Sequence, residues 1–170
     1  IDVGMPREDY EQFMKIAPQE LPNYMFLQTT KSDKNYLLNF AKLRNSNTTF
    51  IEKSTSEILQ NHGIYIDIFP IDGASKNNLI SSLMIWKKRF CDVRISDKMN
   101  IDVKSNHKFS YTIAKIISFL VYPRIEKAIK AQDNLYKKYS FTESEYVANY
   151  GGAWGKREIM PKSYFGKGTT

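Results

Sequence analysis

An aspartate in the middle of an apolar stretch is the first residue of this chain that could carry chemistry. Residues 64–69 read IYIDIF, and every position except Asp67 is β-branched or aromatic, which predicts a buried strand. An ionised carboxylate there is costly unless a nearby Lys or Arg, a ring of backbone N–H donors or a metal ion compensates. Asp67 is therefore a candidate catalytic or metal-binding carboxylate. The alternative is a structural ion pair with a buried Lys or Arg.

A second carboxylate, Asp2, has a similar setting between Ile1 and Val3 and comes shortly before a glycine and the start of a helix. A strand that ends there can present oxygen ligands at the edge of a sheet. Mg²⁺ is bound by one or two carboxylates together with substrate phosphates and waters. Two strands that each contribute one aspartate would meet that need. The alternative for Asp2 is a solvated residue near a terminus.

Two cations and two hydroxyl groups precede the Asp67 strand. Lys42 and Arg44 are two residues apart in NFAKLR, so on a strand they face the same side and suit the phosphates of a nucleotide donor. Thr48 and Thr49 could add hydroxyl donors, and His62 precedes the Asp67 strand. The alternatives are a solvated edge strand with ordinary surface charges and, for the lone histidine, a structural role.

Short strands and longer helices must position these side chains. The first helix is expected to begin at Pro6 and to close at Pro18. Helical spacing returns from Lys76 and again over residues 109–139, with a break or kink at Pro123. Strands are expected at residues 1–5, 24–30, 39–44, 48–53 and 64–69, and an irregular tail at 151–168. Strands first and helices later predict the α+β class.

The later helices carry apolar stripes that predict a buried core. The stripes are Leu79, Leu83, Trp86 and Phe90, then Ile116, Ile117, Leu120 and Val121. Because the basic segment WKKRF accompanies the first stripe, the alternative is a surface that lies on an anionic membrane. The single cysteine, Cys91, is expected to be a small buried thiol.

The composition limits the classes of function. Lys and Arg number 25 and Asp and Glu 18, for a net charge of +7, which favours anionic partners. No zinc-protease, serine-hydrolase or Walker motif is present, and no stacking platform suggests nucleic acid. No apolar run approaches the roughly 18–20 residues that a membrane-spanning helix needs.

Three blocks of the sequence together resemble one family. In order, IDVGMPREDYEQF, FAKLRNSNTTFIEKST and HGIYIDIFPIDG closely resemble the LicD family, which includes bacterial phosphocholine transferases and the fukutin-type proteins of animals. The resemblance implies a nucleotidyltransferase fold of the polymerase-β type, with a mixed sheet flanked by helices and carboxylates that hold a divalent metal. The family's first motif is an acidic cluster, DDDID, followed by VGMPR. Of that cluster this sequence has only Asp2, and Asp67 matches the later carboxylate.

The resemblance also implies an activity. With Mg²⁺ or Mn²⁺, such a site moves phosphocholine or a similar phospho-alcohol from a CDP-linked donor to a hydroxyl of a glycan or lipid-linked glycan, such as lipopolysaccharide or teichoic acid. The expected location is the cytoplasm or the inner membrane face. We expect residues 1–170 to form a single domain that is incomplete at both ends and inactive alone. A non-catalytic basic module that binds anionic glycan or membrane is the rival hypothesis.

Overall fold

A mixed sheet lies at the centre of this computed structural model, which describes residues 1–50, 63–99, 108–150 and 159–165. The strand order is β2-β3-β4-β5-β6, with β1 paired to β4 outside that path, and β1–β4 is the parallel pair among antiparallel ones. The α+β class predicted from the sequence is confirmed. The strands are β1 (Asp2–Pro6), β2 (Met25–Gln28), β3 (Ala41–Asn45), β4 (Tyr65–Ala74), β5 (Tyr146–Ala148) and β6 (Ile159–Pro161).

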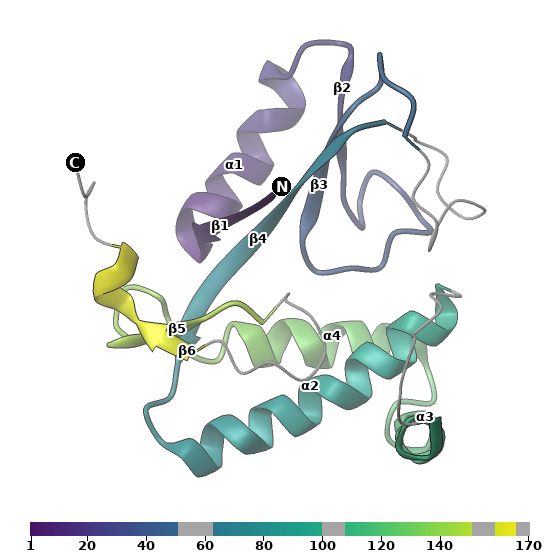
Figure 1. Cartoon of the computed structure of the whole chain (residues 1–170), viewed down its shortest axis with the longest axis vertical. Coiled ribbons are helices and arrows are strands. Elements are labelled where there is room, and N and C mark those ends of the chain that lie inside the picture. Colours follow the sequence, from purple (N-terminus) through teal and green to yellow (C-terminus); the bar gives the residue numbers. More distant parts are fainter. Residues whose placement is uncertain (51–62, 100–107, 151–158, 166–170) are drawn as a thin grey trace.

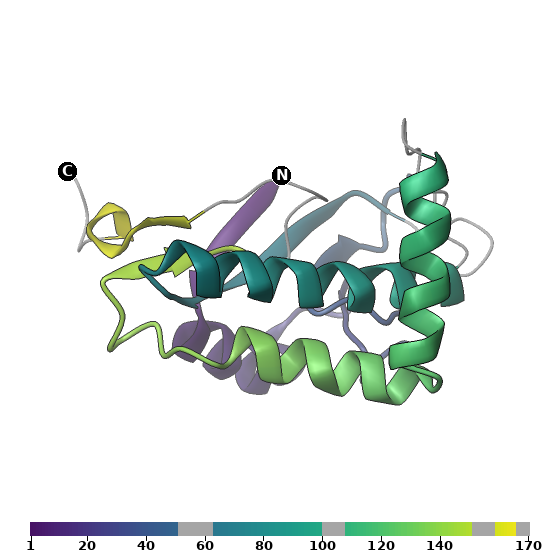
Figure 2. The same ribbon diagram turned by 90° about the horizontal axis from the view of Figure 1, so that it is seen from below.

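The helices surround this sheet in two groups (Figure 1). Helix α1 lies beside β1 and β4, while α2 and α4 run side by side near the far end of β4 (Figures 1 and 2). Helix α3 crosses the C-terminal end of α2 (Figure 2). Their bounds are α1 (Arg7–Glu20), α2 (Asn78–Lys98), α3 (Lys108–Val121) and α4 (Ile125–Tyr136), and a 3-10 helix covers Lys162–Phe165. The predicted break at Pro123 is confirmed.

Helix α1 covers one face of the sheet with the apolar residues that its spacing predicts. Tyr10 and Ala17 form a buried cluster with Leu27, Ala41 and Ile68, and further apolar residues of α1 and the strands pack against it. The helix does not close at Pro18, as the sequence suggested, but continues to Glu20. Proline removes the backbone donor at its own position, but the helix continues beyond it, and the N–H of Leu21 donates to the Ala17 carbonyl.

Strand β4 continues past Pro70, where the sequence predicted its end. Asp67 donates its backbone N–H to the Ile1 carbonyl in front of β1. Because successive residues of a strand face opposite edges, the nitrogen of Pro70 faces the other edge, where pairing with β3 has ended at Ile68. No ladder bond is lost there, so proline is tolerated in the strand.

Two other expectations about elements need correction. Residues 48–53 were expected to form a strand, but 48–50 are irregular and 51–53 lie outside the described residues. The tail over 151–168 was expected to be irregular, but Ile159–Pro161 forms β6 and a 3-10 helix follows it. Strand β6 pairs with β5, and β5 pairs with the end of β4. This late part of the chain therefore extends the sheet.

The prediction that the apolar stripes of the later helices are core is wrong. On α2, Leu79 is 70% exposed and Trp86 is 58% exposed, and on α3, Leu120 is 77% exposed. Helix α2 instead buries Met84, Cys91 and Ile95 on one face, and Val93 near its C-terminal end on another. Within the described ranges, no helix is long and apolar enough to cross a membrane.

Cys91 is buried, as predicted, and should be chemically inert in the native protein. Its side chain is on the buried face of α2, and burial raises the pKa of the thiol to about 11. Because the thiolate is the reactive form, alkylation by iodoacetamide at pH 8 should be about two orders of magnitude slower in the native than in the denatured protein. The native rate should rise as the pH approaches the raised pKa. Equal rates in native and guanidinium-denatured protein would contradict this assignment.

Candidate functional site

The structure brings the two predicted carboxylates together on neighbouring strands. In the parallel pair of β1 and β4, Asp2 is directly opposite Asp67, at the usual strand separation of about 4.8 Å. Ile66 and Ile68 pack against the α1-side cluster, so alternation places Asp67 on the other face of the sheet. Directly paired residues share a face, and Asp2 therefore lies on the same side. The sequence had predicted that two strands each contribute one aspartate, and this placement agrees with it.

A lysine compensates the charge of Asp67. Lys42 Nζ lies 2.9 Å from Asp67 Oδ1, with side-chain exposures of 4% for the lysine and 15% for the aspartate. The two residues are direct neighbours across β3 and β4. The ammonium also lies 3.9 Å from the centre of the Tyr65 ring and 5.6 Å from that of Phe40. Three compensating groups were considered for Asp67: a nearby Lys or Arg, a ring of backbone N–H donors and a metal ion. The structure provides the first of them, a buried lysine.

Arg44 is held inside a polar network on the same face of the sheet. Its side chain is fully buried, and its Nε donates to Gln28 Oε1 at 2.7 Å. Gln28 Nε2 in turn donates to Asp33 Oδ2 at 2.8 Å, and the guanidinium stacks 4.8 Å from the Tyr65 ring centre. The alternative of a solvated edge strand is thus wrong for both cations, because β3 lies between β2 and β4.

The network contains residues that the sequence reading missed. Gln28 is fully buried at the end of β2, and Asp33 is buried in the loop that follows. The available signal was the alternation of MFLQ, which places Gln28 on the face opposite the buried Leu27. A buried amide needs partners, and Arg44 and Asp33 provide them.

Three predicted site residues remain: Thr48 and Thr49, which the structure describes, and His62. Thr48 Oγ1 donates to the Asn45 carbonyl at 2.7 Å and accepts the Ile64 N–H at 2.8 Å, so its hydroxyl secures the turn that precedes β4. Thr49 is exposed. His62 lies outside the described residues. Their roles toward donor phosphates remain predictions.

Asp2 and Asp67 fit a hard divalent cation in ligand type and in position. Both provide carboxylate oxygens, and Asp2 is exposed to solvent. In the part of the chain that the structure describes, no group of three or more Asp, Glu, His or Cys side chains could hold a metal ion. Two carboxylates are nevertheless the usual protein contribution to an Mg²⁺ site that is completed by substrate phosphates and waters.

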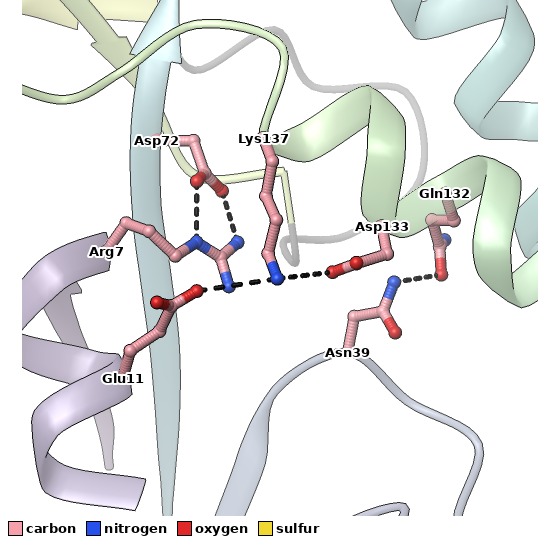
Figure 3. Close-up of polar contacts among 7 residues, drawn as sticks. All are labelled: Arg7, Glu11, Asn39, Asp72, Gln132, Asp133 and Lys137. Carbon is pink, nitrogen blue, oxygen red and sulfur yellow. Dashed lines mark hydrogen bonds and ion pairs between the residues drawn. The ribbon is translucent and has the colours of Figure 1, made fainter.

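A second charged cluster joins α1, β4 and α4 (Figure 3). Arg7 Nε and Nη2 donate to the two carboxylate oxygens of Asp72 at 2.7 and 2.6 Å, and Asp72 is only 2% exposed. Burial disfavours the charged guanidinium, but the hydrogen bonds and charge of Asp72, together with smaller contributions from Glu11 and Asp133, raise the pKa of Arg7. Lys137 Nζ lies 3.4 Å from Glu11 Oε1 and 3.3 Å from Asp133 Oδ1, with all three side chains about half exposed.

Arg7, Glu11, Asp133 and Lys137 of this cluster border a cavity of about 790 Å³ between α1, the end of β2, the loop that follows it and α4. Tyr10, Met14 and Leu27 contribute apolar walls, while Arg7, Glu11 and Lys137 contribute charge. Neither Asp2 nor Asp67 lines it. The cavity and the paired carboxylates are therefore separate features of the molecule.

A comparison with protein-family models finds no match, and comparisons with curated proteins and with solved structures find none either.

Proposed function

We propose that this chain carries the metal-binding part of a phosphotransferase site in a nucleotidyltransferase-like, polymerase-β-type arrangement. The reaction is the transfer of phosphocholine, or a similar phospho-alcohol, from a CDP-linked donor to a hydroxyl of a cell-surface glycan such as lipopolysaccharide or teichoic acid. One observation carries the proposal: β1 and β4 run parallel with Asp2 directly opposite Asp67. The three sequence blocks that resemble the LicD family support the choice of reaction.

In this proposal Asp2 and Asp67 hold Mg²⁺ or Mn²⁺. When bound, such an ion neutralises charge on the donor phosphates and on the oxygens of the transferring group. Lys42 orients the Asp67 carboxylate through the 2.9 Å ion pair. A fixed carboxylate is needed because small displacements of catalytic groups are costly in rate.

The chemistry balances with one proton acceptor. The acceptor hydroxyl oxygen forms a bond to the phosphorus of the transferred group, the bond from that phosphorus to the bridging oxygen breaks, and CMP leaves. A carboxylate of the pair accepts the hydroxyl proton as a general base. Asp2, the more exposed carboxylate, is the more accessible to an incoming hydroxyl.

The two basic residues of β3 differ in their suitability for donor phosphates. Lys42 adjoins Asp67, so its ammonium is next to the proposed metal position. Arg44 Nε is bonded to Gln28 and the side chain is fully buried. We therefore assign the nearby positive charge mainly to Lys42, and to Arg44 the role of stabilising the strands that carry it.

The test is an assay of CMP release from CDP-choline by the full-length protein, with lipopolysaccharide or teichoic acid as the acceptor. We expect release with Mg²⁺ or Mn²⁺ and none after EDTA treatment. A folded protein that shows no release from any CDP-linked donor, yet binds acidic glycan in a salt-sensitive manner, would overturn the proposal. That result would instead support a non-catalytic basic module.

A further inference from the structure

We propose that the exposed apolar faces of α2 and α3 together bind an anionic lipid bilayer. The surface, named here the α2–α3 face, consists of Leu79, Leu83 and Trp86 on α2 and of Ile113, Ile116, Phe119, Leu120 and Val121 on α3. Each of these side chains is at least 40% exposed. The inference goes beyond the proposed function and does not depend on it.

Helix α3 directs its small residues inward and its large apolar residues outward. Ala114 and Ser118 are buried, whereas Ile116 is 57% exposed and Leu120 is 77% exposed. At 100° per residue, Ile116 and Leu120 lie on the side of the helix opposite Ala114 and Ser118. A helix of a soluble domain normally has the reverse arrangement, so this outer face requires an apolar partner.

Polar contacts fix α3 in this orientation. The Arg94 guanidinium of α2 lies 4.0 Å from the Phe119 ring centre and donates to the carbonyls of Tyr122 and Pro123 at 3.2 and 3.4 Å. Lys115 forms an ion pair with Asp97. These contacts hold the flank of α3 that carries Lys115 and Phe119, so rotating α3 to turn its apolar face inward would break them.

The exposed stripe of α2 continues the apolar surface. Leu79, Leu83 and Trp86 are spaced along one face of α2, and Arg94, which contacts α3, lies near the same face two turns further on. Figure 2 shows α3 crossing the C-terminal end of α2, on the side of α2 that faces the viewer. The exposed Trp86 suits the interfacial layer of a bilayer, where tryptophan is enriched.

Positive charge next to the apolar surface favours anionic lipid. Lys87 and Lys98 are exposed on α2, eleven residues apart and therefore on one side of that helix. Immediately after α3, the exposed cations Arg124, Lys127 and Lys130 outnumber the one exposed acid in that segment, Glu126. Each basic residue near an anionic membrane strengthens binding. The same charges would repel a second copy of this face, which argues against a homodimer as its occupant.

The dimensions fit a helix that lies in the membrane surface. Helix α3 has 14 residues and is therefore about 21 Å long, too short to cross a hydrocarbon core of about 30 Å. The arc that carries Ile113, Ile116, Leu120 and Val121 contains no charged residue. A helix of this kind inserts its apolar face into the boundary between headgroups and acyl chains.

The test is co-sedimentation of the full-length protein with phosphatidylcholine vesicles that contain or lack phosphatidylglycerol. We expect binding to the anionic vesicles that weakens at high salt. Leu120→Ser and Ile116→Ser should each lower the partition coefficient about tenfold or more, because a leucine or isoleucine side chain no longer inserts. Ile16→Ser, at a 46% exposed position on α1, is the matched control and should bind like the unmodified protein. Thermal unfolding would confirm that all three variants fold.

Three outcomes would overturn the inference. The first is binding by Leu120→Ser equal to that of the Ile16→Ser control. The second is a concentration-dependent dimer that Leu120→Ser dissociates, which would make a second copy the occupant. The third is a full-length monomer without vesicle binding, which would show that another part of the protein covers the α2–α3 face.

Discussion

Replacing Asp67 with asparagine is expected to remove CMP release from the full-length protein and also to lower its stability. Activity is lost because one of the two paired carboxylates disappears; losing a preorganised charged group typically costs about a hundredfold or more in rate. Stability falls because Lys42, only 3% exposed, loses the carboxylate 2.9 Å away. Breaking one side of such a pair costs about 2–4 kcal/mol.

A double variant separates the two effects. Lys42→Met together with Asp67→Asn removes both charges, so the free energy of unfolding in urea should recover most of the loss while CMP release stays absent. Asp9→Asn, at an exposed position in the first turn of α1, is the control: it should leave CMP release unchanged and lower the free energy of unfolding by no more than about 1 kcal/mol, the usual size of a helix-dipole interaction. Normal turnover in a folded Asp67→Asn protein would show that the carboxylate pair is not catalytic.

Replacing Asp72 with alanine is expected to cause the largest loss of stability among these variants, about 3–5 kcal/mol in the free energy of unfolding. Asp72 is 2% exposed and accepts two hydrogen bonds from Arg7. Without it, the guanidinium is left without its buried partner, and α1 loses its polar connection to the end of β4. The variant that also carries Arg7→Met should recover much of the loss, since no unpaired charge remains.

The neighbouring pair of Glu11 and Lys137 provides the matched control. Their atoms are 3.4 Å apart, but both side chains are about half exposed, and exposed pairs contribute little. Glu11→Gln should therefore change the free energy of unfolding by less than about 0.5 kcal/mol. Chemical denaturation of the unmodified protein, Asp72→Ala, the double variant with Arg7→Met, and Glu11→Gln measures the free energy of unfolding of each. Similar losses for Asp72→Ala and Glu11→Gln would contradict the distinction between buried and exposed pairs.

The local sequence pattern was sufficient to predict the elements that depend only on residues close together in the chain. The alternation around Asp67, the apolar stripe of α1 and the break at Pro123 could all be read from the sequence, because each reflects a period or a missing donor within a few residues. The setting of Asp67 was sufficient to select it as a candidate, because a carboxylate isolated among apolar residues carries a recognisable desolvation cost. For Asp2, spacing alone favoured a solvated residue, and the resemblance to the LicD family supported its selection.

Contacts between distant segments were decided only by the tertiary structure. The register that places Asp2 opposite Asp67, and Lys42 beside it, joins strands from three parts of the chain, and no local pattern specifies which residues of two strands meet. The extension of β4 past Pro70 depended on where β3 ends. Likewise, the apolar stripe of α2 can be read from the sequence, but the sequence does not show whether another element covers that stripe. Since α2 has apolar residues on more than one face, the packing of α3 and α4 decided which residues are buried and left Leu79, Leu83 and Trp86 in solvent.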